Sequence, residues 1–151
     1  MATITVANQI AAPVHRVFEF FTDIGSGSAH VAGIKKIELM TPGRFGLGTK
    51  WLETREVLVI TDSAEMEVTS FERDKTYTIT HHKGGVRIDT VFWFEPVDDA
   101  TNVTVEFEIE SDGLPPGMLA PLNWAIAGKV RDVLGHDLAD LKTSLETPPS
   151  R

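Results

Sequence analysis

The stretch LAPLNWAIAGKVRDVLGHDLADLKTSLE, residues 119–146, decides the expected fold of this chain. Its large apolar residues follow one another mostly at steps of three and four, which places them on one face of an α-helix. They are Leu119, Leu122, Ile126, Val130, Val133, Leu134, Leu138, Leu141 and Leu145. No other stretch of the sequence sustains this period for so long. We therefore predict a long helix close to the carboxyl terminus, with one apolar face.

Most of the chain before this helix alternates apolar and polar residues, which is the pattern of β-strands. The segment 102–111 alternates most regularly, and its outward row of glutamates is typical of a solvated sheet face. Thr61-Asp62 and Gly84-Gly85 are read as turns. The predicted strands are residues 3–10, 34–39, 49–59, 63–71, 76–82, 86–95 and 102–111.

One short helix is expected after the first strand. Proline is tolerated in the first turn of a helix, so Pro13 can begin it. An apolar stripe at helical spacing follows, and it ends near Thr22. The run Gly25-Ser26-Gly27-Ser28 is too rich in glycine and serine to continue this helix, and residues 30–32 form at most one further turn.

The element order predicts an α+β fold. The six strands after the short helix follow one another through short turns, so we expect an antiparallel meander. A curved antiparallel sheet of about seven strands would wrap around the long helix, with one or two short helices after the first strand. A chain of 151 residues suits one domain with one core. We expect that domain to span residues 1–146, with a frayed tail over residues 147–151.

Composition narrows the function classes. The chain has no cysteine, which excludes disulfides, thiolate chemistry and cysteine-ligated zinc. The formal net charge is −8, so binding to nucleic acid is not expected. The amino terminus lacks the pattern of a secretory signal, and no apolar stretch approaches the roughly 20 residues needed to span a bilayer. We expect a cytoplasmic protein without stable membrane insertion.

The long helix carries a polar anomaly on its apolar face. At about 100° per residue, Asp137 falls near the middle of the apolar stripe, and Asn123 lies inside the same arc. A carboxylate that faces a core is costly unless it is paired or hydrated. Asp137 could line a polar part of a ligand cavity and act as a base, or it could reach a basic partner or solvent near the helix end. Both interpretations stay open here.

Two strands carry further candidates. Arg55 shares a strand face with Trp51 and Glu53; it could contact a ligand if that face is concave, or form a surface ion pair if it is convex. The alternation does not decide between the faces. His81 and His82 are adjacent, so they point to opposite faces and cannot chelate one metal together. His81 is expected to face inward, as a wall residue or as a general base.

Aromatic and sulfur-containing side chains from several strands could face the helix with these polar groups. Ligand pockets are mostly apolar with a few polar groups, so we predict one set of ligand-binding residues. No His, Asp and Glu cluster has metal-ligand spacing, and we expect neither a metal nor a cofactor. The weak catalytic candidates are Arg55, His81 and Asp137. The predicted ligand-binding residues are Trp51, Arg55, Met66, Tyr77, His81, Phe92, Phe94, Phe107, Asn123 and Asp137.

Several segments together resemble a known superfamily. They are IAAP at 10–13, VFEFFTD at 17–23, GLGTKW at 46–51, EVTSF at 67–71, FWFEP at 92–96 and LADLKTSLE at 138–146. The chain is similar to the START-like helix-grip superfamily, also called SRPBCC or Bet v 1-like, and within it to the polyketide cyclase/dehydrase and lipid-transport branch. The resemblance implies a ligand cavity between sheet and helix. It transfers no catalytic residue, because the branch shares no single catalytic motif.

Two main hypotheses follow. The first is binding, and possible transport, of a small hydrophobic or amphipathic molecule such as a lipid, a polyketide-like aromatic or an isoprenoid. The second is an enzyme of the cyclase, dehydratase or aromatase type that uses the same cavity. A weaker third hypothesis is an interaction module that acts through a sheet edge or the loop before the long helix. Either a monomer or a homodimer is compatible with the sequence.

Overall fold

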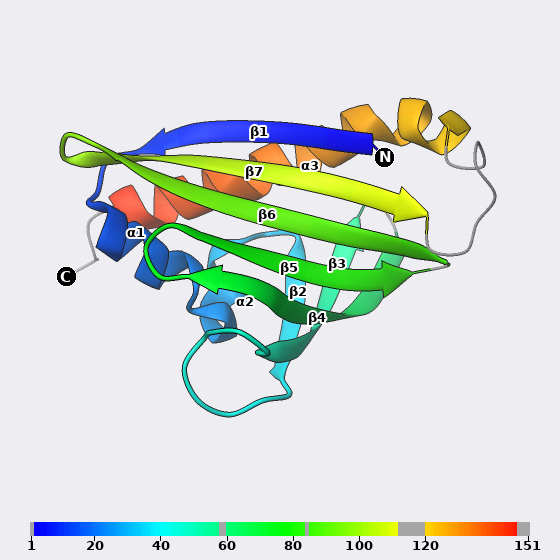
Figure 1. Ribbon diagram of the computed structural model, residues 1–151, viewed down its shortest axis with the longest axis horizontal. Helices are drawn as coiled ribbons and strands as arrows, with labels where there is room; N and C mark the ends of the chain where they lie inside the picture. The colour runs from blue at the N-terminus through cyan, green and yellow to red at the C-terminus, as the bar shows by residue number, and fades with distance from the viewer. Residues whose placement is uncertain (1, 58–59, 84, 112–119, 148–151) are drawn as a thin grey trace.

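A computed structural model of the chain describes residues 2–57, 60–83, 85–111 and 120–147. The side chains of residues 2, 57, 60, 83, 111 and 120–127 are outside this description. Figure 1 shows the arrangement of its helices and strands. In chain order the elements are β1 (Ala2–Ile10), α1 (Val14–Phe21), η1 (Ile24–Ser26), α2 (Gly27–His30), β2 (Ile34–Leu39), β3 (Lys50–Val57), β4 (Ile60–Glu72), β5 (Thr76–Lys83), β6 (Val86–Val97), β7 (Ala100–Ser111) and α3 (Ala120–Glu146).

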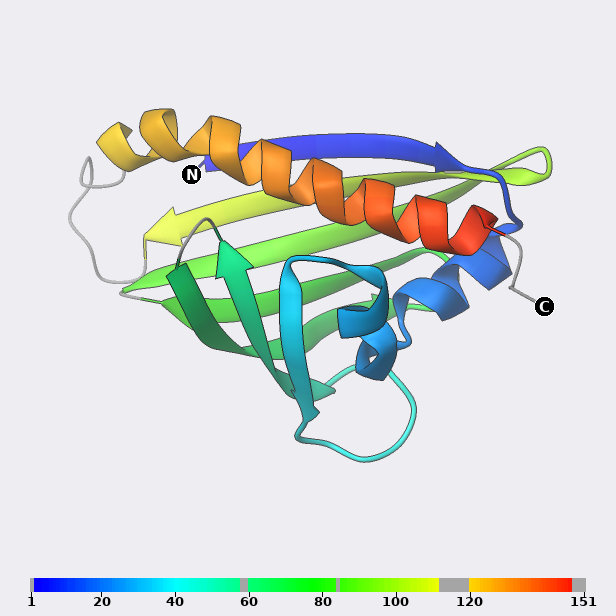
Figure 2. The same ribbon diagram turned by 180° about the vertical axis from the view of Figure 1, so that it is seen from behind.

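The strands form one antiparallel sheet in the order β1-β7-β6-β5-β4-β3-β2. This order is a meander from β2 to β7, with β1 added beside β7. Figure 2 shows α3 lying across the concave side of this sheet, next to β1. The expected α+β helix-grip fold is therefore confirmed, and so is the long carboxy-terminal helix.

The sheet is bent as well as twisted. The register of β4 against β5 shifts between Val68 and Ser70, and that of β2 against β3 shifts between Ile34 and Lys36. A β-bulge adds a residue to one strand, which bends that strand and increases its local twist. In Figure 2, β2, β3 and the first half of β4 accordingly curl away from the plane of β5 to β7. This curl gives the sheet the concave face that α3 partly covers.

The turns between strands use residues that tolerate a left-handed backbone. Asp74 and Asp98 have φ values of 61° and 54°, and Gly85 has a φ of 77°. Aspartate and glycine adopt this conformation more readily than other residues, which is consistent with these three tight turns. The prediction of a turn at Thr61-Asp62 is wrong, because both residues belong to β4 and pair with Glu56 and Arg55.

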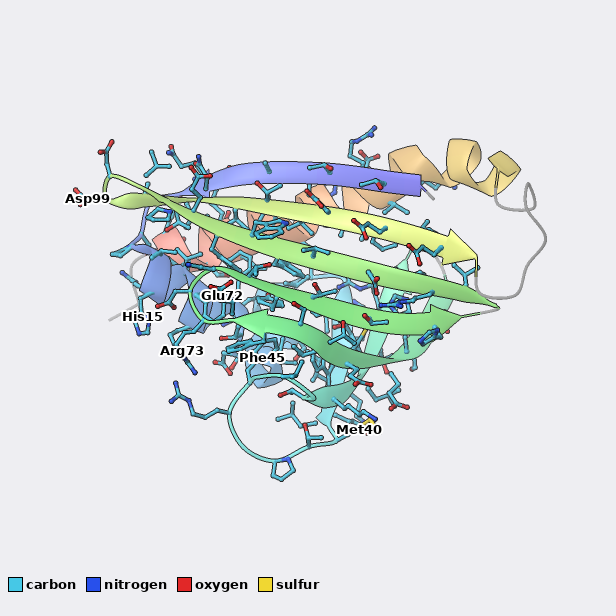
Figure 3. All side chains as sticks on the ribbon, viewed as in Figure 1. His15, Met40, Phe45, Glu72, Arg73 and Asp99 are labelled. Atoms are coloured by element: carbon cyan, nitrogen blue, oxygen red, sulfur yellow. The ribbon has the colours of Figure 1, made fainter. Side chains whose placement is uncertain are left out.

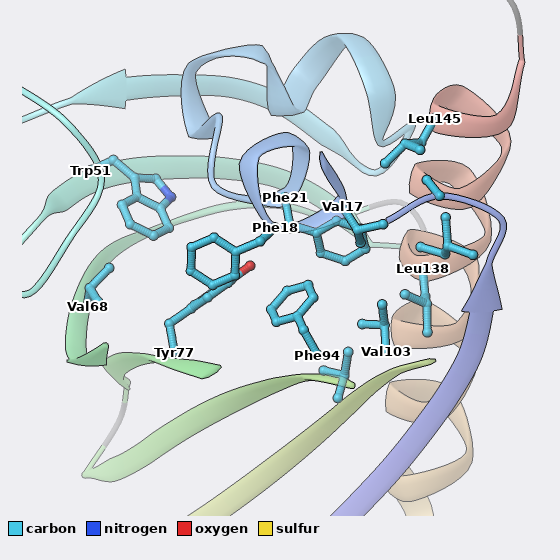
Figure 4. Close-up of a cluster of buried hydrophobic side chains, with 13 residues drawn as sticks. Val17, Phe18, Phe21, Trp51, Val68, Tyr77, Phe94, Val103, Leu138 and Leu145 are labelled. Atoms are coloured by element: carbon cyan, nitrogen blue, oxygen red, sulfur yellow. The ribbon is translucent and has the colours of Figure 1, made fainter. Parts of the chain in front are cut away.

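An aromatic core fills the end of the sheet that α1 covers (Figure 4). The Phe18 ring on α1 meets Phe94 edge-to-face, with ring centroids 5.2 Å apart, and Phe21 does the same at 5.4 Å. Tyr77 stacks on Phe92 at 4.6 Å. Such ring pairs stabilise a core beyond the apolar area that they bury. Because these rings concentrate at one end, that end is solidly packed.

Surface contacts also fix α1 on the sheet. His15 on α1 and Arg73 in the β4–β5 turn lie at the same end of the molecule (Figure 3). Arg73 donates a hydrogen bond to Glu19 over 3.2 Å, and Nδ1 of His15 lies 3.1 Å from Asp74 Oδ1. These groups are largely exposed, so the contacts contribute little to stability individually.

The Gly-Ser run after α1 is more ordered than the sequence indicates. Residues 24–30 form η1 and the single-turn helix α2, where the sequence predicts a break. Here tertiary packing decides, because α2 lies against β2. A Cβ atom on Gly27 would come within 2.8 Å of Ile37 Cδ1, so a glycine allows this close approach.

The carboxy-terminal half of α3 is held on the fold by buried leucines and by side-chain hydrogen bonds to the backbone of other segments. Leu138 and Leu145 are buried in the core. Lys142 Nζ donates a hydrogen bond to the Gln9 carbonyl over 2.6 Å, and Asp140 Oδ2 accepts one from the Ala32 N–H over 3.1 Å. Among helices in the part of the chain that the structure describes, none is both long and apolar enough to span a bilayer.

Candidate ligand cavity

A cavity of about 430 Å³ lies between the concave face of the sheet and α3. This volume falls within the range of roughly 300–1,000 Å³ that is typical of small-molecule sites. Its wall is built from α1, α2, every strand from β2 to β7, and α3. The aromatic core stops at one end of the sheet, and the cavity occupies the space beyond it.

Most of the residues predicted to bind a ligand lie on this wall. They are Trp51, Arg55, Met66, Tyr77, His81, Phe92, Phe107 and Asp137. Phe94 is 5% exposed and packs against Phe18 and Phe21, so it belongs to the core and does not line the cavity. The remaining candidate, Asn123, has a side chain outside the described residues.

The structure decides which face of β3 points inward. Trp51, Glu53 and Arg55 line the cavity, and Ala64 and Met66 of the neighbouring strand β4 line it beside them. The next residue, Glu56, is exposed and its carboxylate lies 3.7 Å from the Lys35 ammonium. Arg55 is therefore a wall residue and not part of a convex surface pair.

Arg55 is held between two carboxylates. Its Nη1 atom donates to both carboxylate oxygens of Asp137, over 3.0 and 2.9 Å. Its Nε and Nη2 atoms donate to Glu53 Oε2, over 3.3 and 3.2 Å. The other Glu53 oxygen accepts a hydrogen bond from the Trp51 indole over 3.3 Å. Asp137 thus meets both interpretations left open by the sequence, because it reaches a basic partner and also lines the cavity.

Burial shifts the ionisation of this cluster. Burial raises the pKa of Asp137, and the neighbouring Glu53 and Asp140 also raise it, while Arg55 lowers it by less. Burial lowers the pKa of Arg55, but the charges of Asp137 and Glu53 raise it by more. The guanidinium therefore stays charged, and Asp137 is easier to protonate than a free aspartate, mainly because it is buried.

His81 lies on the same wall, while His82 is exposed on the opposite face of β5, as the strand geometry predicts. Burial lowers the pKa of His81, and the nearby Glu53 raises it by less. The ring is consequently neutral at neutral pH. Within the residues that the structure describes, no group is hydrogen-bonded to this ring, so its nitrogens are available to a ligand.

Several wall residues are missing from the sequence-based set, and His30 and Lys129 are two of them. His30 lines the cavity, and its ring lies 4.6 Å from that of Phe20. A Cβ atom on Gly33 would lie 3.2 Å from Arg55 Nη1, so the backbone there closes over the guanidinium. Neither position carries a local sequence signal. Lys129 lies on the α3 face of Val133 and Asp137 at helical spacing, and that pattern could have identified it.

The described residues give no positive indication of a metal site. Across residues 2–57, 60–83, 85–111 and 120–147, no group of three histidine, aspartate or glutamate side chains is placed to hold a metal ion. The described wall carries hydrogen-bonding groups, charged side chains and the imidazoles of His30 and His81.

A family model described as "Polyketide cyclase / dehydrase and lipid transport" matches residues 1–146. The chain belongs to this family. The resemblance seen in the sequence is thereby confirmed. The family description covers lipid transport as well as polyketide cyclisation and dehydration. Membership therefore suggests that the chain binds a small hydrophobic molecule or acts on one. Among curated proteins, none matches the chain significantly.

Solved structures from several bacteria share the fold of this polyketide cyclase/dehydrase family member. The ZhuI aromatase/cyclase from Streptomyces sp. R1128 superposes with a TM-score of 0.78 at 14% identity, covering 95% of this chain and 93% of that one. The protein TTHA0849 from Thermus thermophilus has a TM-score of 0.77 at 15% identity, with coverages of 95% and 96%. A START superfamily protein from Mycobacterium smegmatis has a TM-score of 0.75 at 15% identity, with coverages of 97% and 98%. At these identities the likeness shows the fold alone.

Proposed function

We propose that the protein binds a small hydrophobic or amphipathic molecule in the cavity between the sheet and α3. The observation that carries this proposal is the cavity itself, an apolar space with one charged cluster on its wall. Protein interiors are normally close-packed, and voids larger than a water molecule are few. A mostly apolar space of about 430 Å³ is far larger than such voids and matches the size of small-molecule sites.

The charged cluster supports the same conclusion. A buried ion pair contributes little to stability compared with well-packed apolar residues, because both charges lose their hydration. The side chains of Arg55 and Asp137 are each only 22% exposed, and that of Glu53 is 12% exposed. Charges kept at this depth next to an apolar space are suited to hold the polar end of an amphipathic ligand.

Filling the cavity tests this proposal. Ala64 lies on the wall in β4, and its neighbour Glu65 is exposed. We expect the wild-type protein to bind the neutral fluorescent probe N-phenyl-1-naphthylamine saturably, with a blue-shifted emission. Ala64→Trp should weaken this binding at least tenfold, because the indole occupies the same space. Glu65→Trp adds the same ring outside the cavity and serves as the matched control. Equal binding by both variants would contradict the proposal.

A second function is favoured by one specific observation. The neutral His81 imidazole and the Arg55–Asp137 pair line one cavity, so a base and a charged pair can reach the same ligand. This arrangement supports an enzyme of the cyclase, dehydratase or aromatase type, in which His81 removes a proton next to a carbonyl group.

The two functions are separable by experiment. In an enzyme, His81→Gln should abolish turnover of a 3-hydroxyacyl thioester to the enoyl thioester and water, while probe binding persists. In a carrier, neither the wild type nor the variant shows turnover, and native mass spectrometry finds a co-purified apolar molecule bound to the wild type. Turnover that His81→Gln leaves unchanged would exclude His81 as the base.

A further inference from the structure

The charged cluster has a composition that restricts the polar end of the ligand. Each of the three nitrogen atoms of the Arg55 guanidinium already donates to a carboxylate of the protein itself. A ligand carboxylate would therefore meet a guanidinium whose charge two protein carboxylates already balance, and it would have to use the remaining N–H groups or displace Glu53 or Asp137. The displaced carboxylate would then be left without its cation in a mostly buried position.

The other charged residues on the described wall do not make the cavity favourable for a ligand carboxylate. Glu53, Asp137, Asp23 and Asp62 bring carboxylates to it, whereas the basic residues are Arg55 and Lys129. Asp23, Asp62 and Lys129 are all exposed, so water screens their charges. The largely buried charges are then the two carboxylates of Glu53 and Asp137 and the one guanidinium of Arg55. Burial is the main cause of the raised pKa of Asp137, and the charges of Glu53 and Asp140 add to the rise.

The same cluster retains capacity to accept hydrogen bonds. An ionised carboxylate has about four acceptor positions on its two oxygens. Glu53 Oε1 accepts only a long bond of 3.3 Å from the Trp51 indole among the described residues. Each Asp137 oxygen accepts one bond from Arg55. A hydroxyl or ammonium group could therefore donate to these oxygens without breaking the Arg55 contacts.

We propose that this cavity selects amphipathic ligands whose polar end donates hydrogen bonds, an alcohol or a protonated amine, and discriminates against carboxylates. This inference rests on the proposed binding function and adds the chemical class of the ligand. Glu53 and Asp137 are the specificity-determining residues, because they occupy Arg55 and present acceptor oxygens to the cavity.

Competition between ligands of equal chain length tests the inference. Decan-1-ol, decylamine and decanoate are each titrated at neutral pH against N-phenyl-1-naphthylamine bound to the wild-type protein. We expect the alcohol and the amine to displace the probe with inhibition constants at least tenfold lower than that of decanoate. If decanoate competes as well as the alcohol or better, the selectivity is overturned while the binding function stands. If the probe itself does not bind, the binding function fails, and the inference falls with it.

Substitutions in the charged cluster test which residues cause the selectivity. Glu53→Gln and Asp137→Asn each remove one negative charge from the cluster and release part of Arg55. Each should narrow the ratio between the inhibition constants of decanoate and decan-1-ol about three- to tenfold. Glu56→Gln removes the same charge from the exposed face of the same strand and should leave this ratio unchanged. Thermal unfolding of each variant checks that it is folded. If one of the two cluster variants does not fold, the other still tests the role of the cluster. An equal effect of Glu56→Gln would overturn the role of the cluster in favour of net charge.

Discussion

Arg55 joins two elements that are far apart in the sequence. Its guanidinium lies between Glu53 on the same strand and Asp137 on α3, and all three side chains are largely buried. Removing one partner of such a group costs more than the group contributes, because the remaining charges lose their compensation. Arg55 therefore influences stability as well as the chemistry of the cavity.

We expect Arg55→Met to lower the free energy of unfolding by about 3 kcal/mol, since two mostly buried carboxylates lose their cation. Urea denaturation measures this change. The double variant Arg55→Met/Asp137→Leu should recover part of the loss, because it removes one of the stranded charges. Glu56→Gln, on the exposed side of β3, should stay within about 0.5 kcal/mol of wild type. A fully stable Arg55→Met variant would show that the cluster is not electrostatically coupled.

His81 gives a pH-dependent contribution of defined sign. Burial lowers its pKa in the folded state, so the unfolded chain binds more protons below the ordinary histidine pKa of about 6.5. Folding stability should therefore fall as the pH drops through and below that value. In His81→Gln this part of the acid decline should be absent. Urea midpoints at a series of pH values from 7.5 to 5 check the slope, and identical slopes for both proteins would contradict the shift.

Single residues also show what could and could not be predicted from the sequence. Helical spacing alone places Asp137 on the apolar face of α3, and this position holds in the structure. The alternation in β3 could not decide which way Arg55 points, because Leu52 made the opposite face equally plausible. The choice is made by pairing with β4, which puts Ala64 and Met66 on the cavity side. The residues of β3 alone do not identify this neighbouring strand.

At the scale of elements, α3 combines a packed end with an open middle. Leu138 is 2% exposed and Leu145 is 5% exposed, and both belong to the core shared with α1. Val130, Val133 and Leu134 line the cavity, and Leu138 lies on its wall as well as in the core. One apolar stripe thus serves two purposes, and its two parts should respond differently to substitution.

Leu138→Ala should lower the free energy of unfolding by about 2–4 kcal/mol, because a buried leucine is replaced by a cavity. Val133→Ala, which only enlarges a space already present, should cost about 1 kcal/mol or less by comparison. Thermal and urea denaturation of the two variants measure the difference. Equal losses would indicate that α3 packs uniformly along the sheet.

Most of the elements could be predicted because their periods are local properties of the chain. The strands, α1 and α3 all follow from alternation or from helical spacing, with boundaries close to those observed. The helical turns over residues 24–30 could not be predicted, because they depend on packing against β2. The position of the cavity likewise depends on two bulges, at Val68 and near Ile34, that bend the sheet. No local pattern marks these bulges.

At the scale of the whole molecule, the fold divides into a solid end and a hollow end. The aromatic rings under α1 hold one end of the sheet, and the cavity takes the other. A ligand that binds only the folded state stabilises it by mass action, by about 2.7 kcal/mol at 100 times the dissociation constant. For a chain of this size that gain corresponds to a rise of about 5–10 °C in Tm.

Decan-1-ol at 100 times its dissociation constant should therefore raise the Tm of the wild-type protein by about 5–10 °C. The Ala64→Trp variant, whose indole occupies the cavity, should show little change at the same concentration. Differential scanning calorimetry measures both. A rise of the same size in Ala64→Trp would place the binding site elsewhere on the molecule.

The most direct measurement is a crystal structure of the protein with decan-1-ol bound. We expect continuous density for the alcohol between α3 and the concave face of the sheet, with its hydroxyl group within hydrogen-bond distance of Glu53 or Asp137. Density for the alcohol only on the outer surface, or α3 packed directly onto the sheet with side chains filling the space, would contradict a ligand cavity at this place.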